Sequence, residues 1–449
     1  MKNLLYRYFS IQKYNTSIRT EIFAGISTYL SLAYIFVVNP AILNKAGLDL
    51  SAVLFATAVA SGITTIVMGL WARLPFVVAP GLEMNGFFAF VAVGVIHLTW
   101  QQALGAVFWS GVLCVVFTII PARQKIISSI PDGLKANIAV SVGFFVAAIG
   151  LSLSGIIVFE EGVPSHFGSF TSPKALSMYI GLIISVLLGI KRLKFAGGML
   201  VAIIVAAVFC KFNGIEVKTP AKISSHMLDA FAQLDWLVIF KDIRVLPVLV
   251  VFFVIDYYGS IGKFIGLTKS TNLVDKDGNL PNMVKALYVD GGGTIGGALL
   301  GTSSLITYVE SAVGIAAGGR TGIVAIVCGI LMLCSIVFTP LIGLIPVEAT
   351  SGVLLYVAWL LLPFNQPPTL SGETAFASWK RQLDKIDFVT ALFMATLSLV
   401  TFSLDKAMLA GFLIYTLKSL FYKGHHNWYL TASTILLIIS VASQYIYRA

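Results

Sequence analysis

Residues 302–322, TSSLITYVESAVGIAAGGRTG, lie among long apolar segments and yet are too polar and too interrupted to form a membrane-crossing helix. The run opens with hydroxyl and β-branched residues, reaches one carboxylate at Glu310, and continues in small residues to Gly318. Unpaired backbone is tolerated at membrane depth only where protein or a watery cavity surrounds it. The pattern therefore predicts a short strand followed by a half-helix, which together form one wall of a binding site.

The composition of the chain predicts an all-α polytopic membrane protein. Of its 449 residues, 58% are hydrophobic and 11% are charged. A membrane span needs about 20 mostly apolar residues, and the apolar runs divide into about fourteen segments, some of them shortened or broken by Gly and Pro. The net charge of +10 does not indicate nucleic-acid binding, because Lys and Arg lie in short loops where they fix orientation. The four Cys are expected to pack as small hydrophobic residues, and the five His lack metal-ligand spacing, so neither a metal nor another cofactor is expected.

The apolar segments form two sets of seven on either side of a polar stretch at residues 211–241. An odd number of spans in each half orients the halves oppositely, as in transporters built from inverted repeats. The loop charges agree if the N-terminus is cytoplasmic. A bundle without symmetry is the alternative, and residues 428–447 form either a fifteenth span or an interfacial helix. The predicted spans are 21–40, 51–71, 75–95, 100–120, 134–156, 174–190, 194–211, 244–267, 284–301, 302–318, 321–345, 347–363, 386–404 and 406–422.

An inverted repeat requires the third span to be interrupted like the tenth. Residues 75–90, PFVVAPGLEMNGFFAF, meet this requirement. Pro80 ends an extended run, because it can neither donate to a strand ladder nor continue a helix, and a half-helix follows. Two half-helices that begin near the midplane aim their positive N-terminal ends at one point, where we place the substrate.

Three polar residues are the main candidates for this site. Glu310, at the start of its half-helix, offers a carboxylate to the N–H groups of a heterocycle, or else caps its own helix. Glu83 and Asn85 hold the mirrored position in the first half. Asn85 offers a donor and an acceptor to a planar base edge, or makes a polar contact between helices. Glu83 supplies a second carboxylate at the same depth.

Other candidates have equally open interpretations. Asp256 in the eighth span is either functional or paired with Lys263, which lies two helical turns further on roughly the same face. Phe87 stacks on a flat ring or packs in the core, and Thr307 offers a hydroxyl. The DGGGTIGG run at 290–297 lacks the ending of a phosphate-binding loop and is expected to allow close helix packing.

Five stretches resemble the purine permeases of the azaguanine/hypoxanthine/adenine type, in the nucleobase:cation symporter-2 or xanthine/uracil permease family. They are TEIFAGISTYLSLAYIFVVNPAIL (20–43), APGLEMNGFFAF (79–90), IPDGLKANIAVSVGFF (130–145), GNLPNMVKAL (278–287) and GTSSLITYVESAVGIAAGGRTG (301–322). The resemblance, which runs from residue 20 to 422, implies fourteen spans in a seven-plus-seven repeat. It also implies a base bound between the third and tenth spans by Glu310, Asn85 and the backbone near Gly81 and Ser304, with proton-coupled uptake.

The resemblance further implies a core domain and a gate domain. The expected divisions are a core at 1–125 and 243–345, a gate at 126–212 and 346–422, an extracytoplasmic connector at 213–242 and a C-terminal apolar segment at 423–449.

Two departures from the family pattern concern the site. In the third span, the family usually has Ala-Pro-Gly-Met-Gly-Leu-Asn-Ala. This chain has Glu83 in place of the second Gly and Gly86 in place of the last Ala. The eighth-span motif Asp-Thr-x-Gly-Thr aligns on residues 259–263, GSIGK, so that its carboxylate is missing. Our hypothesis is that Glu83 replaces this carboxylate in proton coupling or base recognition, with Asp256 as the rival.

The sequence thus predicts a secondary active transporter that imports a purine nucleobase or similar heterocycle by proton symport, with the core moving against the gate. An anion transporter on the same plan and a non-transporting receptor are the alternatives, and an enzyme is not expected. The expected partners are the nucleobase, a proton in preference to sodium, the lipid bilayer and a second copy of the chain. We expect a multi-pass protein of the plasma or inner membrane with a cytoplasmic N-terminus.

Overall fold

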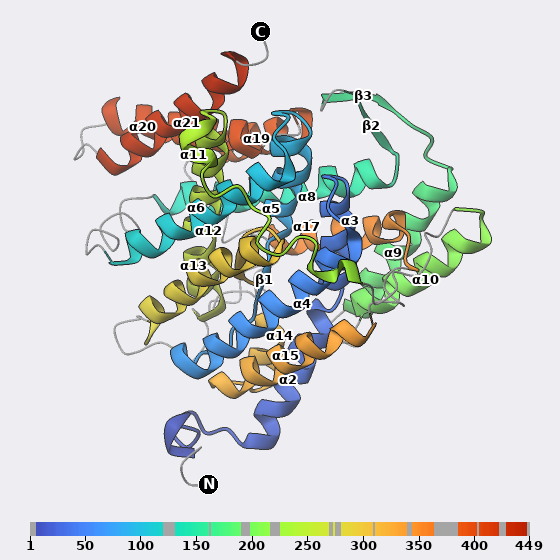
Figure 1. Ribbon diagram of the computed structural model, residues 1–449, viewed down its shortest axis with the longest axis vertical. Coiled ribbons are helices and arrows are strands. Elements are labelled where there is room, and N and C mark those ends of the chain that lie inside the picture. Colours follow the sequence, from blue (N-terminus) through green and yellow to red (C-terminus); the bar gives the residue numbers. More distant parts are fainter. Residues whose placement is uncertain are drawn as a thin grey trace.

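The computed structural model describes residues 6–119, 131–160, 163–189, 198–215, 225–268, 273, 280–308, 310–338, 344–362, 385–401, 404–421 and 428–446. The protein is mostly helical, with the two chain ends at opposite ends of its long axis (Figure 1).

The first half of the chain forms α2 (Ile18–Leu32), α3 (Ile35–Asn44), α4 (Leu50–Val67), the π-helical turn η1 (Met68–Ala72), β1 (Val78–Pro80), α5 (Leu82–Gly86), the π-helical η2 (Phe87–Val93), α6 (Trp100–Ile119), α8 (Asp132–Leu153), the hairpin strands β2 (Ile157–Glu160) and β3 (Val163–Phe167), α9 (Pro173–Gly189) and α10 (Gly198–Phe212).

The second half forms η3 (Ser225–Leu228), α11 (Val238–Lys241), α12 (Val245–Thr268), α13 (Met283–Leu300), β4 (Leu305–Thr307), α14 (Ser311–Ala316), α15 (Gly322–Cys334), η4 (Ser335–Phe338), η5 (Val347–Thr350), α17 (Ser351–Leu361), α19 (Lys385–Val400), α20 (Leu404–Phe421) and α21 (Trp428–Ile446).

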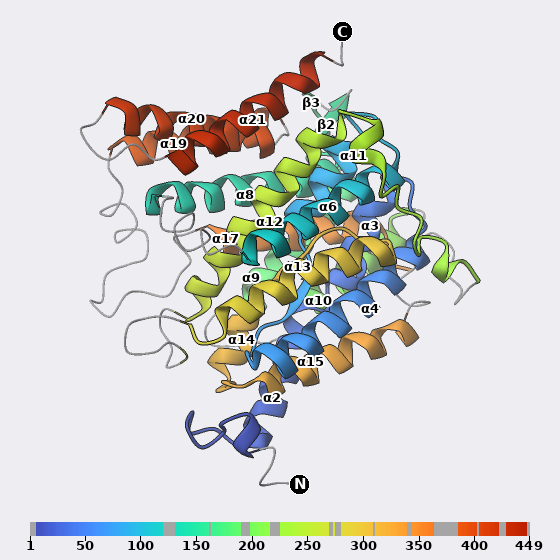
Figure 2. The ribbon, with the colours of Figure 1, turned by 60° about the vertical axis from the view of Figure 1, so that its left-hand side comes forward.

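Each predicted span contains helix, and the third and tenth contain a strand followed by a short helix, as predicted. Among the described residues, four helical stretches are long and apolar enough to cross a membrane: Ile18–Asn44, Leu50–Ala72, Trp100–Ile119 and Ala136–Leu153. The C-terminal apolar segment forms α21, which packs on α20 and α12; Figure 2 shows α19, α20 and α21 side by side. The predicted domain boundaries at residues 125 and 422 lie outside the described part of the chain.

The contacts between helices repeat when the two halves are exchanged. Helix α15 packs on α2 and α4, and in the same way α6 packs on α12 and α13. Helix α9 packs on α10 and α17, and in the same way α19 packs on α20 and α8. If the spans are numbered in the predicted order, each helix pair has a counterpart in which both helices are shifted by seven spans. The packing therefore agrees with a seven-plus-seven inverted repeat.

Glycines bring α4 and η1 into backbone contact with α15. A Cβ atom on Gly322 would lie 2.0 Å from the carbonyl oxygen of Gly69, and one on Gly329 would lie 2.7 Å from that of Gly62. Lipid tails are as apolar as the helix surface, so close backbone approach at small residues is a main source of helix association in bilayers. These crossings fix α15 against the first half of the chain.

We expect Gly322→Ala to lower the free energy of unfolding by about 3 kcal/mol, because the obstacle is backbone and cannot rotate away. Thermal unfolding of the purified protein in detergent would measure this loss. Gly292→Ala on α13 is the control, since an added Cβ there meets nothing within 4 Å and alanine favours helix. Equal stability of the Gly322→Ala variant and the wild type would contradict the contact.

The glycine run at 290–297 also serves packing, as predicted. A Cβ on Gly291 would lie 3.0 Å from the side chain of Val115 in α6, and one on Gly293 would lie 2.6 Å from that of Thr64 in α4. All four cysteines lie in the described part of the chain and none of them forms a disulfide there; Cys114, Cys210 and Cys328 are buried.

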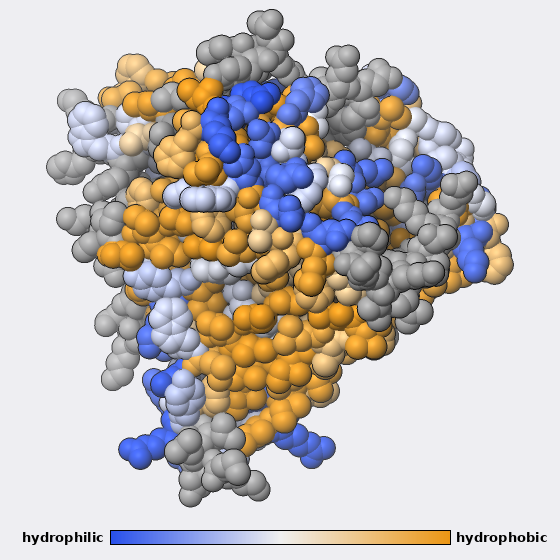
Figure 3. Space-filling model, in the orientation of Figure 1, coloured by the Kyte–Doolittle hydropathy of each residue, from blue (hydrophilic) through white to orange (hydrophobic). Residues whose placement is uncertain are grey.

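The surface carries a broad apolar area over α4 and α15 (Figure 3). Exposed large hydrophobic residues on these two helices and on η1 include Ile63, Val67, Leu70, Trp71 and Ile330. An exposed apolar area of this extent is expected of a protein that lies in lipid.

Candidate functional site

The two interrupted spans meet at their strands, as the sequence predicts. Strands β1 and β4 pair antiparallel, with Val78 opposite Thr307 and Pro80 opposite Leu305. The pairing extends beyond Pro80, because the Gly81 N–H donates to the Ser304 carbonyl oxygen at 3.0 Å. The backbone at residues 81 and 304, expected at the site, is thus the point where the two halves of the chain join.

Side chains satisfy the backbone that this short ladder leaves unpaired. The Thr65 hydroxyl of α4 lies 3.0 Å from both the N–H and the carbonyl oxygen of Val78. The Val77 N–H donates to the Ser311 hydroxyl, also at 3.0 Å. These contacts meet the requirement that irregular backbone at membrane depth be buried in protein.

Glu310 immediately precedes α14 and is 5% exposed. Its Oε1 accepts a 2.7 Å hydrogen bond from the Tyr34 hydroxyl, which lies between α2 and α3. Its Oε2 has no hydrogen-bond partner among the described residues. The carboxylate makes no capping bond to α14, so the helix-cap interpretation does not describe this structure. One buried acceptor remains open.

Asn85 is fully buried in α5. Its Oδ1 accepts a hydrogen bond from the Ser303 hydroxyl, and its Nδ2 has no partner within the described ranges. A buried polar atom without a partner costs roughly 1–3 kcal/mol. Asn85 therefore supplies an open donor, as Glu310 supplies an open acceptor.

Glu83 forms an ion pair with Lys263 of α12, with Glu83 Oε1 and Lys263 Nζ 3.2 Å apart. The two side chains are 8% and 15% exposed. The suggested structural pair between Lys263 and Asp256 is therefore not the ion pair that forms. Seven residues of helix separate that pair by about 10 Å along the axis, so the ammonium reaches across to α5 instead. Glu83, which departs from the third-span motif, thus contacts Lys263, which stands at the last position of the eighth-span motif.

Tyr308 lies among these charges. Its hydroxyl donates to the Pro80 carbonyl oxygen, and Lys263 Nζ is 6.0 Å from the centroid of its ring. Glu310 follows Tyr308 by two residues and accepts the hydrogen bond from Tyr34. The structure thus gathers two carboxylates, one ammonium and two tyrosines where β1 meets β4.

Asp256 belongs to a second buried polar group. Its Oδ2 accepts hydrogen bonds from Thr294 of α13 at 2.8 Å and from Ser304 at 2.6 Å. The Thr307 hydroxyl donates to Asp290 at 3.0 Å. Since successive strand residues point to opposite faces, Thr307 faces away from Tyr308, and the structure does not bring its hydroxyl to Glu310.

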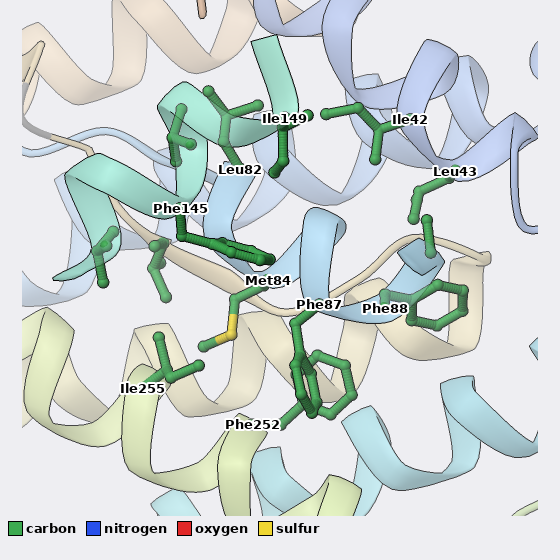
Figure 4. Packing of buried hydrophobic residues seen from close by; sticks show 14 of the residues in the cluster. Ile42, Leu43, Leu82, Met84, Phe87, Phe88, Phe145, Ile149, Phe252 and Ile255 are labelled. Atoms are coloured by element: carbon green, nitrogen blue, oxygen red, sulfur yellow. The ribbon is translucent and has the colours of Figure 1, made fainter. Parts of the chain in front are cut away.

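Phe87 is fully buried and meets Phe252 of α12 edge to face, with ring centroids 5.2 Å apart. Figure 4 shows this pair beside Met84, with Phe145 of α8 on the other side of α5. The ring takes part in core packing, the alternative interpretation of the sequence, and offers no open face here. Gly86 lies against α8 as well, since a Cβ there would be 2.3 Å from Ile149 Cδ1.

Sequence reasoning missed several residues around the site. Tyr34 and Ser303 contact predicted residues, and Asn39 of α3 donates to Thr302 at 3.0 Å. In the sequence, Asp290 opens the glycine run at 290–297. A polar or ionisable residue inside an apolar span is itself a signal, which Asn39 and Asp290 both give.

Comparison with known proteins gives consistent matches. The model of a permease family, the xanthine/uracil permeases, matches residues 19–363. The adenine permease AdeQ of Escherichia coli is 34% identical over 413 residues, covering 92% of this chain and 89% of its own. The guanine/hypoxanthine permease PbuO of Bacillus subtilis is 31% identical over 416 residues, covering 91% and 93%. The transmembrane domain of the cyanobacterial bicarbonate transporter BicA has a similar fold, with a TM-score of 0.66 at 14% identity over 87% of this chain and 96% of that one.

Proposed function

Since this chain belongs to the xanthine/uracil permease family, we propose that it transports a purine nucleobase, bound where the third and tenth spans meet. The family predicted from the sequence motifs is confirmed, as is a multi-pass membrane transporter rather than an enzyme. The observation that carries the proposal is a pair of buried polar atoms, Glu310 Oε2 and Asn85 Nδ2, which have no hydrogen-bond partner among the residues that the structure describes.

A purine edge is complementary to these two atoms. A ring N–H donates to Glu310 Oε2, and a ring nitrogen or carbonyl oxygen accepts from Asn85 Nδ2. Tyr34 holds the other oxygen of Glu310, and Ser303 holds the other end of the Asn85 amide. Both groups are therefore oriented before the base arrives, which reduces the entropy lost on binding.

Transport is coupled to a proton at Glu310. Protonation removes a buried charge and exchanges an acceptor for a donor at the atom that contacts the base. Glu83 is already balanced by Lys263, and Asp256 is held by two hydroxyls. This assignment replaces our sequence-based hypothesis that Glu83 is the coupling carboxylate.

Alternating access follows from a core that moves against a gate. Helices α2, α4, α6, α12, α13 and α15 contact one another around the strands, and α8, α9, α10, α17, α19 and α20 form a second set of contacts. Helix α5, which carries Glu83 and Asn85, packs on α8 at the boundary between the two sets. Movement there would open the base site. We retain the plasma or inner membrane, a cytoplasmic N-terminus, a proton in preference to sodium and a homodimer as proposals.

Counterflow of labelled base in reconstituted vesicles tests the proposed function. Vesicles loaded with unlabelled hypoxanthine, guanine or adenine are expected to accumulate the labelled base transiently, because a carrier exchanges substrate across the membrane. Counterflow by bicarbonate but by no base would favour the anion-transporter alternative. Base binding without counterflow would indicate a receptor.

A further inference from the structure

The ammonium of Lys263 has more hydrogen-bond donors than its surroundings use. An ammonium carries three N–H donors, and the bond to Glu83 Oε1 uses one of them. Among the described residues the ammonium makes no second hydrogen bond, and its Nζ lies 6.0 Å from the centroid of the Tyr308 ring. The side chain is only 15% exposed. Burying a charged donor without a partner is unfavourable, so these donors are expected to meet an acceptor on a ligand.

Among the polar groups near β1 and β4 that have unused hydrogen-bonding capacity, donors outnumber acceptors. Lys263 and Asn85 Nδ2 offer donors, and Glu310 Oε2 offers one acceptor. A ligand that matches them needs one N–H group for Glu310 and strong acceptors for the rest. A carbonyl oxygen on the ligand matches the ammonium better than an amino group does, because the carbonyl oxygen accepts a hydrogen bond. A hydrogen bond from a charged donor is about twice as strong as one between neutral groups.

We propose that Lys263 makes this site select 6-oxopurines, such as hypoxanthine and guanine, over adenine. The inference rests on the proposed function and names the substrate class of the same site. A 6-oxopurine presents a carbonyl oxygen where adenine presents an amino group. Adenine in the same pose would direct an N–H donor at the ammonium and leave the N–H groups that do not contact Glu83 without an acceptor. Glu83 acts as a positioning residue that holds the ammonium beside β1 and β4.

Competition binding tests the selection. Purified protein in lipid nanodiscs is saturated with labelled hypoxanthine and competed with unlabelled hypoxanthine, guanine and adenine. The wild type is expected to bind hypoxanthine about ten- to a hundred-fold more tightly than adenine, the range that a charge-assisted hydrogen bond supplies. In Lys263→Met the ratio is expected to fall to about one, chiefly through weaker hypoxanthine binding.

Two further variants keep the test decisive. Glu83→Gln/Lys263→Met leaves no unpaired charge, so it remains informative if Lys263→Met does not fold. Lys174→Met is the matched control, because Lys174 forms a 3.0 Å ion pair with Glu348 on the exposed end of α9. Its base preference is expected to equal that of the wild type.

The outcomes separate this inference from the proposed function. Tighter binding of adenine by the wild type, or an unchanged preference in both Lys263 variants, would overturn the selection by Lys263 and leave purine transport intact. Failure of every purine to bind the wild type would overturn the proposed function and the inference together.

Discussion

Vesicles containing the Glu310→Gln variant are expected to lose at least a hundred-fold of their proton-driven base uptake. The amide keeps the shape of the side chain, but it cannot exchange a proton, and its nitrogen cannot accept the N–H of the base. Leaving a buried donor of the ligand without its acceptor costs a few kcal/mol of binding. The measurement is initial uptake of labelled hypoxanthine under an imposed pH gradient.

The pH dependence separates coupling from binding. Wild-type uptake is expected to increase as the external solution is acidified, because base and proton enter together. Any residual exchange by Glu310→Gln is expected to be independent of the gradient. Glu348→Gln, at the exposed ion pair with Lys174, is the control and should behave as the wild type. Gradient-driven accumulation by Glu310→Gln would exclude Glu310 as the coupling acid and return Glu83 and Asp256 to consideration.

The Tyr34→Phe variant tests the role of the hydrogen bond to Glu310 Oε1, the oxygen that does not contact the base in the proposed complex. The hydroxyl donates to Glu310 Oε1 at 2.7 Å, so its removal frees the carboxylate to rotate and weakens the base contact. A five- to ten-fold increase in the concentration needed for half-maximal uptake is expected. An unchanged value would mean that Tyr34 does not orient Glu310.

The second large effect concerns stability. Each of the single variants Glu83→Gln and Lys263→Met is expected to lower the free energy of unfolding by about 3–5 kcal/mol, since each leaves one buried charge without its partner. The double variant Glu83→Gln/Lys263→Met is expected to recover most of this loss, because no unpaired charge remains. Thermal unfolding in detergent, followed by intrinsic fluorescence, measures all four proteins of the cycle.

The same cycle on an exposed pair supplies the comparison. Lys174 and Glu348 are separated by 3.0 Å, but their side chains are 52% and 20% exposed, so each single change should cost less than about 1 kcal/mol. Losses that simply add between Glu83→Gln and Lys263→Met would show that the two residues do not act as a pair. That result would restore Glu83 as an independent carboxylate.

The sequence alone determined the membrane-spanning helices, the position of the two interruptions and the main residues at their junction. Span length and apolar content depend only on the local chain, and Pro80 and the polar run at 302–322 interrupt their spans by local chemistry. Because the halves repeat, two matching interruptions predicted that β1 would meet β4. Glu310 and Asn85 were identifiable because a polar residue within a membrane span is energetically costly and is therefore a candidate for a functional role.

Only the tertiary structure decided which polar groups pair. Spacing along α12 suggested Asp256 as a partner of Lys263, but the ammonium reaches Glu83 on another helix. Ser303 binds Asn85, and Thr307 turns to Asp290. These partners lie on different elements, and the rotation of each helix against its neighbours sets their distances. Helix rotation depends on packing contacts such as Gly69 against Gly322, which no spacing within a single segment reveals.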